Sequence, residues 1–319
     1  LAYMDTTARP QDDFFRFVNG QWLDNTEIPS DKTTWGSFLE LREKTDNDAL
    51  ALLEAATTDE NLDPSGDQAK AVYLYQTIMD TVTRNDQGIQ PIEPYLAQIE
   101  EIENVADLQE YLTQMQLFGG GGFFSFGVRA DAKDSNMNTA YLYPGSLGLP
   151  DRDYYVANDA DSREKRSLYQ EHIARMLQFL GDSEEEATEN AETILAFETK
   201  LAEPRFDKVQ SRDARLSYNP MNVEELQALV PAINWNRYFE GIEAAGVDTI
   251  IVSQPKYMEV VQQTLSADQL KEWKEYLRWT LFNRAASMLS SEIERADWEF
   301  YSKTLRGVQE QLPLQERAL

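Results

Sequence analysis

The chain offers few side chains that could act as metal ligands or nucleophiles. It contains one histidine, His172, and no cysteine. A catalytic zinc ion needs two or three protein ligands, and zinc-binding helices usually supply two histidines four residues apart. His172 lies beside an apolar helical stripe with no second histidine, which favours a packed side chain over a ligand. We therefore predict no metal site and no catalytic residue in this chain.

The sequence also lacks the motifs of serine hydrolases and of phosphate-binding loops. No Gly-x-Ser-x-Gly segment is present, so the nucleophile elbow of serine hydrolases is missing. The glycine run 119–122 lacks the Lys-Ser/Thr pair of a phosphate loop and precedes a predicted strand, not a helix. We interpret these glycines as residues without side chains that let the backbone pass closely packed into the predicted strand.

A cation falls on the apolar face of a predicted helix near the amino terminus. The pattern predicts a long helix that begins after Asp31, and Phe38 and Arg42 lie on its apolar stripe. A charge on such a face needs a partner. Arg42 therefore serves either in a structural ion pair or in contact with a ligand.

An anion occupies a similar position later in the chain. Ser183 and Glu186 form a capping box that predicts a helix, and Glu198 lies on its inward face. Burial of an unpaired carboxylate is costly, so we expect an arginine partner, either Arg212 or Arg215. The alternative is a catalytic acid, for which no histidine or second carboxylate stands at a suitable spacing.

Most of the chain carries the apolar periodicity of helices, with one clear exception. The runs 123–130 and 139–143 alternate in polarity, are rich in aromatic residues and flank a turn-forming polar segment. We predict a mainly α fold, a large multi-helix lobe with a small β-hairpin at about residues 123–143. Residues 249–252 form a further short strand-like run.

Composition narrows the possible functions. With 319 residues, 42% of them hydrophobic, the chain can bury a sizeable core. Its net charge of −27 repels phosphate groups, so we exclude nucleic acid as a partner. No apolar run approaches the roughly 18 residues of a membrane span. Residues 1–10 lack the plan of a signal peptide, so we expect any leader to be absent from this sequence.

Five segments along the chain carry a pattern that is specific when taken together. They are RPQDDFFRFVNGQWL from Arg9, IPSDKTTWGSF from Ile28, SLGLPDRDYY from Ser146, RDARLSYNPMNVEEL from Arg212 and YLRWTLFNRAASMLS from Tyr276. In this order they resemble the amino-terminal half of the neprilysin family, which includes the bacterial endopeptidase O group. These are zinc metallopeptidases that act on oligopeptides.

The resemblance implies a two-lobed, largely helical enclosure. The family's Asn-Ala-x-Tyr, His-Glu-x-x-His and Glu-x-x-x-Asp motifs lie downstream of the matching region, so the zinc belongs to a companion catalytic half and none is bound by this chain. Residues 1–56 would pack against the catalytic lobe, and residues 57–319 would form the non-catalytic lobe, incomplete without downstream sequence. Phe38 and Arg42 match family residues that line the substrate pocket, and they are our predicted substrate-binding residues.

The resemblance also implies a function. We expect a non-catalytic amino-terminal subunit or fragment of a zinc metalloendopeptidase for oligopeptides, inactive alone and closing over the active site of a companion chain in a heterodimer. Residues 312–319 resemble the start of a helix, which favours such a partner. The alternative is a standalone helical peptide-binding or structural protein without catalysis. Family resemblance places the protein outside the cytoplasm, in the periplasm, on the surface or secreted.

Overall fold

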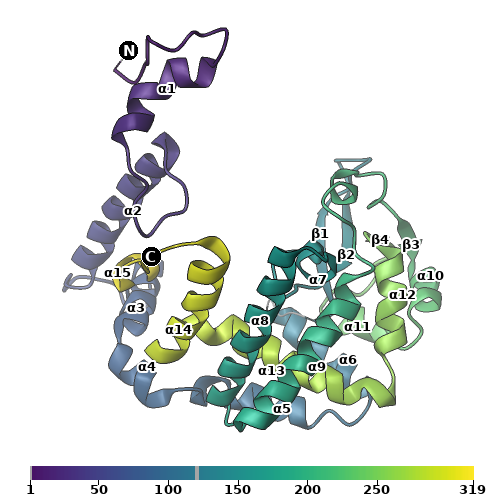
Figure 1. Ribbon diagram of the computed structural model, residues 1–319. Helices are drawn as coiled ribbons and strands as arrows, with labels where there is room; N and C mark the ends of the chain where they lie inside the picture. Colours follow the sequence, from purple (N-terminus) through teal and green to yellow (C-terminus); the bar gives the residue numbers. More distant parts are fainter. Residues whose placement is uncertain (1, 119–121) are drawn as a thin grey trace. The chain divides into compact units, whose positions relative to one another are not determined.

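The chain folds into two compact units, each of which is described by itself. The computed structural model describes residues 2–118 and 122–319, so the predicted close approach at residues 119–121 lies outside the described residues. The first unit joins both ends of the chain, Leu1–Thr83 and Trp298–Leu319, and the second is Arg84–Asp297. Figure 1 labels their helices and strands. The predicted division after residue 56 separates a segment that would pack against a catalytic lobe from the rest of the chain. It stays a prediction.

The first unit is helical. Its longest helix begins at Ser37, so the predicted start after Asp31 is wrong. The Gly36 carbonyl accepts the first helical hydrogen bonds, from the amides of Leu39 (2.9 Å) and Glu40 (3.0 Å). The helical segments are α1 (Phe14–Asn25), α2 (Ser37–Ala56), α3 (Asp67–Met79), α4 (Thr81–Gln87), which continues into the second unit, a π-helical segment (Glu299–Thr304) and α15 (Leu314–Arg317).

A segment near the amino terminus and a segment near the carboxyl terminus are hydrogen-bonded to each other inside the first unit. The Ser30 carbonyl accepts hydrogen bonds from the amides of Gln309 (3.0 Å) and Glu310 (3.1 Å), and the Ser30 hydroxyl donates to the Glu310 carboxylate (2.9 Å). The predicted helical turn near residue 314 forms as α15, which contacts α2 and α3. A single turn is not stable in isolation, so these contacts hold it in place.

The second unit contains the predicted hairpin as part of a four-stranded sheet. Its strands are β1 (Phe124–Ala130), β2 (Asn138–Pro144), β3 (Pro220–Asn222) and β4 (Thr249–Val252), in the order β1-β2-β4-β3. β1 and β2 are antiparallel, with Phe124 opposite Pro144, which confirms the hairpin. β4 runs parallel to β2 and antiparallel to β3. The three residues of β3 are too few to show a strand pattern in the sequence.

The rest of the second unit is mainly helical. The predicted capping box starts α9, where the Glu186 amide donates to the Ser183 hydroxyl (3.3 Å). A second capping box starts α10, where the Glu225 amide donates to the Asn222 side chain (2.8 Å). The helices are α5 (Glu93–Glu100), α6 (Val105–Leu117), α7 (Arg152–Val156), α8 (Ala160–Phe179), α9 (Glu184–Ala202), α10 (Val223–Leu229), α11 (Trp235–Gly241), α12 (Pro255–Thr264), α13 (Leu270–Ala285) and α14 (Ser291–Trp298).

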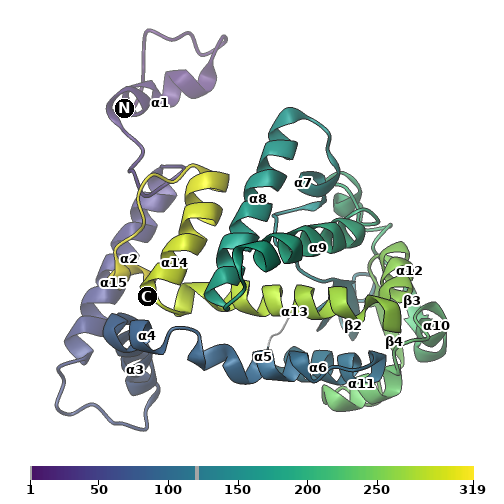
Figure 2. The same cartoon turned by 60° about the horizontal axis from the view of Figure 1, so that its bottom comes forward.

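Aromatic side chains fill the core between sheet and helices. Trp273 of α13 is fully buried, and its ring centre lies 5.0 Å from that of Phe123 and 4.7 Å from that of Phe197 on α9. Helices α8, α9 and α13 lie side by side in both views (Figures 1 and 2). The mainly α fold with a small sheet is thus confirmed. No helix within the described residues combines the length and apolarity needed to cross a membrane.

Candidate functional site

The predicted substrate-binding residues lie exposed on α2. Phe38 is 89% exposed, and the Arg42 side chain follows one turn later with 76% of its surface exposed. The Arg42 Nε atom lies 3.5 Å from Asp46 Oδ2, an exposed pair of the i, i+4 kind that contributes about 0.5 kcal/mol. The helix face that the sequence suggested was buried is therefore open, and both side chains are free to contact another molecule.

Phe38 belongs to a larger group of exposed apolar side chains in the amino-terminal region. Within α1 only Gly20 is buried, and within α2 only Ala56. So many large apolar side chains are rarely exposed together on a protein surface, and patches of this kind often mark interaction sites. The exposed large apolar side chains between residues 2 and 56 are Tyr3, Phe14, Phe15, Leu23, Ile28, Phe38, Leu41 and Leu52.

The described residues do not fit a zinc ion. No group of three or more His, Cys, Asp or Glu side chains within residues 2–118 and 122–319 could hold a metal. His172 is 5% exposed and packs edge-on against Trp279, with ring centres 5.8 Å apart. Burial lowers the pKa of His172 to about 3, so its ring is neutral at physiological pH. It is a core residue of α8.

Glu198 is fully buried, but the prediction that Arg212 or Arg215 pairs with it is wrong. The carboxylate oxygen Oε2 accepts hydrogen bonds from the hydroxyls of Tyr155 (2.6 Å) and Tyr169 (3.0 Å). Arg215 instead pairs with its neighbour Asp213 and is exposed, and Arg212 bonds through its backbone in a short turn. Sequence spacing could not show that the tyrosines converge on Glu198 through tertiary packing.

The surroundings of Glu198 set its protonation. Burial raises the pKa of Glu198 to about 7, although the hydrogen bonds from Tyr155 and Tyr169 and the charge of Arg205 lower it. With no exposed surface the carboxyl cannot meet a substrate, so the catalytic-acid alternative is not supported. We interpret Glu198 as a structural anchor.

That anchor holds the loop 145–155, which contains the segment SLGLPDRDYY of the family resemblance. The Leu149 amide donates to the Tyr155 hydroxyl (2.8 Å), and the Tyr276 hydroxyl donates to the Ser146 carbonyl (3.2 Å). The Trp279 ring nitrogen donates to the Tyr169 hydroxyl (3.0 Å), which fixes the direction of the next bond to Glu198. The loop is therefore fastened to α9 and α13 by hydrogen bonds.

The charged residues of the same loop also have a structural role. Asp151 caps α7 by accepting a hydrogen bond from the Asp153 amide (2.9 Å), and it pairs with Lys208 (3.2 Å). The Arg152 guanidinium donates to the Glu203 carbonyl at the end of α9 (3.2 Å). These contacts hold the charged part of the loop against neighbouring helices.

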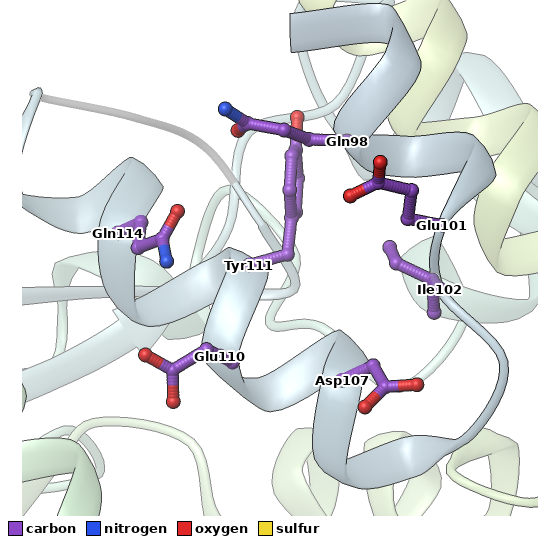
Figure 3. A pocket seen from close by; sticks show the side chains of 7 residues that line it. All are labelled: Gln98, Glu101, Ile102, Asp107, Glu110, Tyr111 and Gln114. Carbon is purple, nitrogen blue, oxygen red and sulfur yellow. The ribbon is translucent and has the colours of Figure 1, made fainter.

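A pocket that sequence reasoning missed lies between α5 and α6 in the second unit. It encloses about 250 Å³, and Tyr111 stands at its centre, on α6 (Figure 3). Burial raises the pKa of Tyr111 to about 12, so its hydroxyl is neutral. The pocket is lined by Gln98, Glu101, Ile102, Asp107, Glu110, Tyr111 and Gln114. No sequence motif marks it, since two helices bring these residues together.

Several known proteins are similar to this chain in sequence and in fold. Residues 10–319 match the amino-terminal region of peptidase family M13. Human endothelin-converting enzyme 1 is 29% identical over 318 residues, covering 94% of this chain and 40% of that enzyme. A neutral endopeptidase of Lactobacillus helveticus is 26% identical, covering 99% of this chain and 48% of that protein. The chain thus spans less than half the length of these relatives.

Solved structures of metallopeptidases have the same fold as this chain. The zinc metalloprotease Zmp1 of Mycobacterium tuberculosis, solved with an inhibitor, matches with a TM-score of 0.93 and 31% identity, over all of this chain and 48% of that one. PepO from Lactobacillus rhamnosis shares the fold, with a TM-score of 0.82 at 21% identity. The fold is that of a helical lobe of two-lobed metallopeptidases. The chain belongs to peptidase family M13, which confirms the neprilysin-like resemblance.

Proposed function

We propose that this chain is the non-catalytic amino-terminal half of a neprilysin-like zinc metalloendopeptidase that cleaves oligopeptides. One observation carries the proposal: residues 10–319 match family M13, yet the chain spans only 40–48% of the relatives' length. The described residues hold no group suited to zinc. The metal and the His-Glu-x-x-His helix would therefore come from a catalytic half, over which this chain forms the enclosure.

The amino-terminal segment 1–56 is the part of the chain that we expect to pack against the catalytic half. It carries exposed aromatic side chains on both α1 and α2, such as Phe14, Phe15 and Phe38. Burial of a large apolar side chain stabilises a complex by about 1.5–3 kcal/mol. A companion chain in a heterodimer would cover these side chains, and a catalytic half on the same polypeptide would do so equally well.

Purification of the tagged chain from its native source tests the proposal. We expect a polypeptide with a His-Glu-x-x-His segment to co-purify, linked to the chain or separate from it, with an equimolar amount of zinc. The complex should cleave oligopeptides and lose this activity with a zinc chelator, whereas the isolated chain should cleave nothing. A stable, zinc-free monomer without such a partner would contradict the proposal and favour a standalone binding protein. Cell fractionation should place the complex outside the cytoplasm, as the family resemblance implies.

Arg42 gives a test of substrate contact in the assembled enzyme. We expect Arg42→Ala to lower kcat/KM for oligopeptides by about 10- to 100-fold, because a charged contact to substrate is worth roughly 1.5–3 kcal/mol. Phe38→Ala should raise KM through loss of apolar contact. The measurement is steady-state cleavage of a fluorogenic oligopeptide.

A matched control for Arg42→Ala is Lys70→Ala, which removes a cation from a similar exposed helical ion pair, with Asp67. It should leave kcat/KM unchanged. If both substitutions had the same effect, or Arg42→Ala had none, Arg42 would serve only its ion pair with Asp46.

A further inference from the structure

We propose that the pocket around Tyr111 binds a basic side chain of an oligopeptide, with an adjacent apolar side chain of the same peptide in the neighbouring pocket. The proposal takes the peptide class of ligand from the proposed function. It concerns a binding site in the second unit that is built only from residues of this chain.

The first observation is the Tyr111 hydroxyl. Tyr111 is 5% exposed, yet within residues 2–118 and 122–319 its hydroxyl has no hydrogen-bond partner. Figure 3 shows the side chain rising from α6 with its hydroxyl end beside Gln98, on the side that the Glu101 carboxylate faces. A polar group at the wall of a pocket needs a partner, which a bound ligand can supply in place of water.

The second observation is the charge of the pocket. Three carboxylates and no basic side chain line it. Asp107 is engaged by the Asn104 side chain (2.8 Å) and Glu110 by Arg237 (2.8 Å), which leaves Glu101 to pair with a ligand. The protein's net charge of −27 also attracts cations and repels anions. An ammonium group could donate to both the Glu101 carboxylate and the Tyr111 hydroxyl.

The third observation is a second, apolar pocket of about 200 Å³ that shares Tyr111 as a wall. Met115 of α6 and Phe118, which directly follows that helix, line it together with Leu277 and Leu281 of α13. Arg284 also lines this pocket, which disfavours a cation there. Neighbouring residues of a peptide lie about 3.8 Å apart at their Cα atoms, so a basic and an adjacent apolar side chain can enter the two pockets together.

Binding of short peptides to the full chain tests this site without a catalytic half. The probe is acetyl-Leu-Lys-Leu-amide, and its uncharged match is acetyl-Leu-Gln-Leu-amide. We expect calorimetry to show the lysine peptide binding about tenfold more tightly, as a charge-assisted hydrogen bond predicts. Glu101→Gln and Tyr111→Phe should each weaken the lysine peptide about fivefold and leave the glutamine peptide unchanged.

The control is Glu103→Gln, an exposed acidic residue close in sequence that does not line the pocket. It should leave the affinity for the lysine peptide unchanged. Equal binding of the two peptides would overturn the proposal. So would an equal loss with Glu101→Gln and Glu103→Gln, which would show attraction to overall charge alone. Because the assay uses no catalytic half, either failure leaves the proposed function standing, and absence of a catalytic half leaves this binding result standing.

Discussion

Gly148→Ala should destabilise the second unit by about 3 kcal/mol or more. A Cβ atom at position 148 would overlap the Tyr169 hydroxyl and stand 2.6 Å from Tyr169 Cζ. The hydroxyl cannot move aside without loss of its hydrogen bonds to Trp279 and Glu198. Overpacking and a broken buried network therefore act together. Urea unfolding followed by tryptophan fluorescence measures the change.

Two further variants make the result interpretable. Gly127→Ala is the matched control, since a Cβ atom there meets nothing within 4 Å, and it should change the free energy of unfolding by less than about 0.5 kcal/mol. Combining Gly148→Ala with Tyr169→Phe removes the clashing oxygen, so the double variant should lose less stability than the sum of the two single variants. Strict additivity would mean that Gly148 acts through its backbone and not through Tyr169.

Glu198→Gln should change how stability depends on pH. The folded pKa of Glu198 is about 7 against an ordinary value of 4.5, so its contribution to stability is complete below pH 4.5 and is lost as pH rises through 7. The difference corresponds to about 3 kcal/mol. Glutamine resembles the protonated acid and does not titrate. We therefore expect the variant to gain about 3 kcal/mol relative to wild type between pH 4.5 and pH 8.

The measurement is urea unfolding of both proteins across this pH range. Glu186→Gln on the same helix is a control of opposite sign, because hydrogen bonds from Ser183 lower the pKa of Glu186. Its contribution is present at neutral pH and is lost as pH falls, so this variant should lose most stability at neutral pH. Parallel pH profiles for wild type and Glu198→Gln would show that Glu198 does not titrate in this range.

Local patterns along the chain predicted much of the fold. Ser183 and Glu186 predict the start of a helix, and the alternating run 123–130 predicts a strand, because both patterns depend only on residues a few positions apart. The family resemblance likewise follows from the segments themselves. By contrast, the strand 220–222 becomes one only through pairing with β4, and three residues carry too little pattern to reveal it.

The site residues likewise divide into those that the sequence predicted and those that only the tertiary structure revealed. From sequence alone, the chain's one histidine and lack of cysteine already argued against a zinc site, and the family pattern singled out Phe38 and Arg42. Only the tertiary structure showed that Phe38 is exposed, that two tyrosine hydroxyls hold Glu198, and that Tyr111 stands in a pocket. Burial and hydrogen-bond partners depend on which distant segments meet in space, and the spacing of residues along one helix does not contain that information.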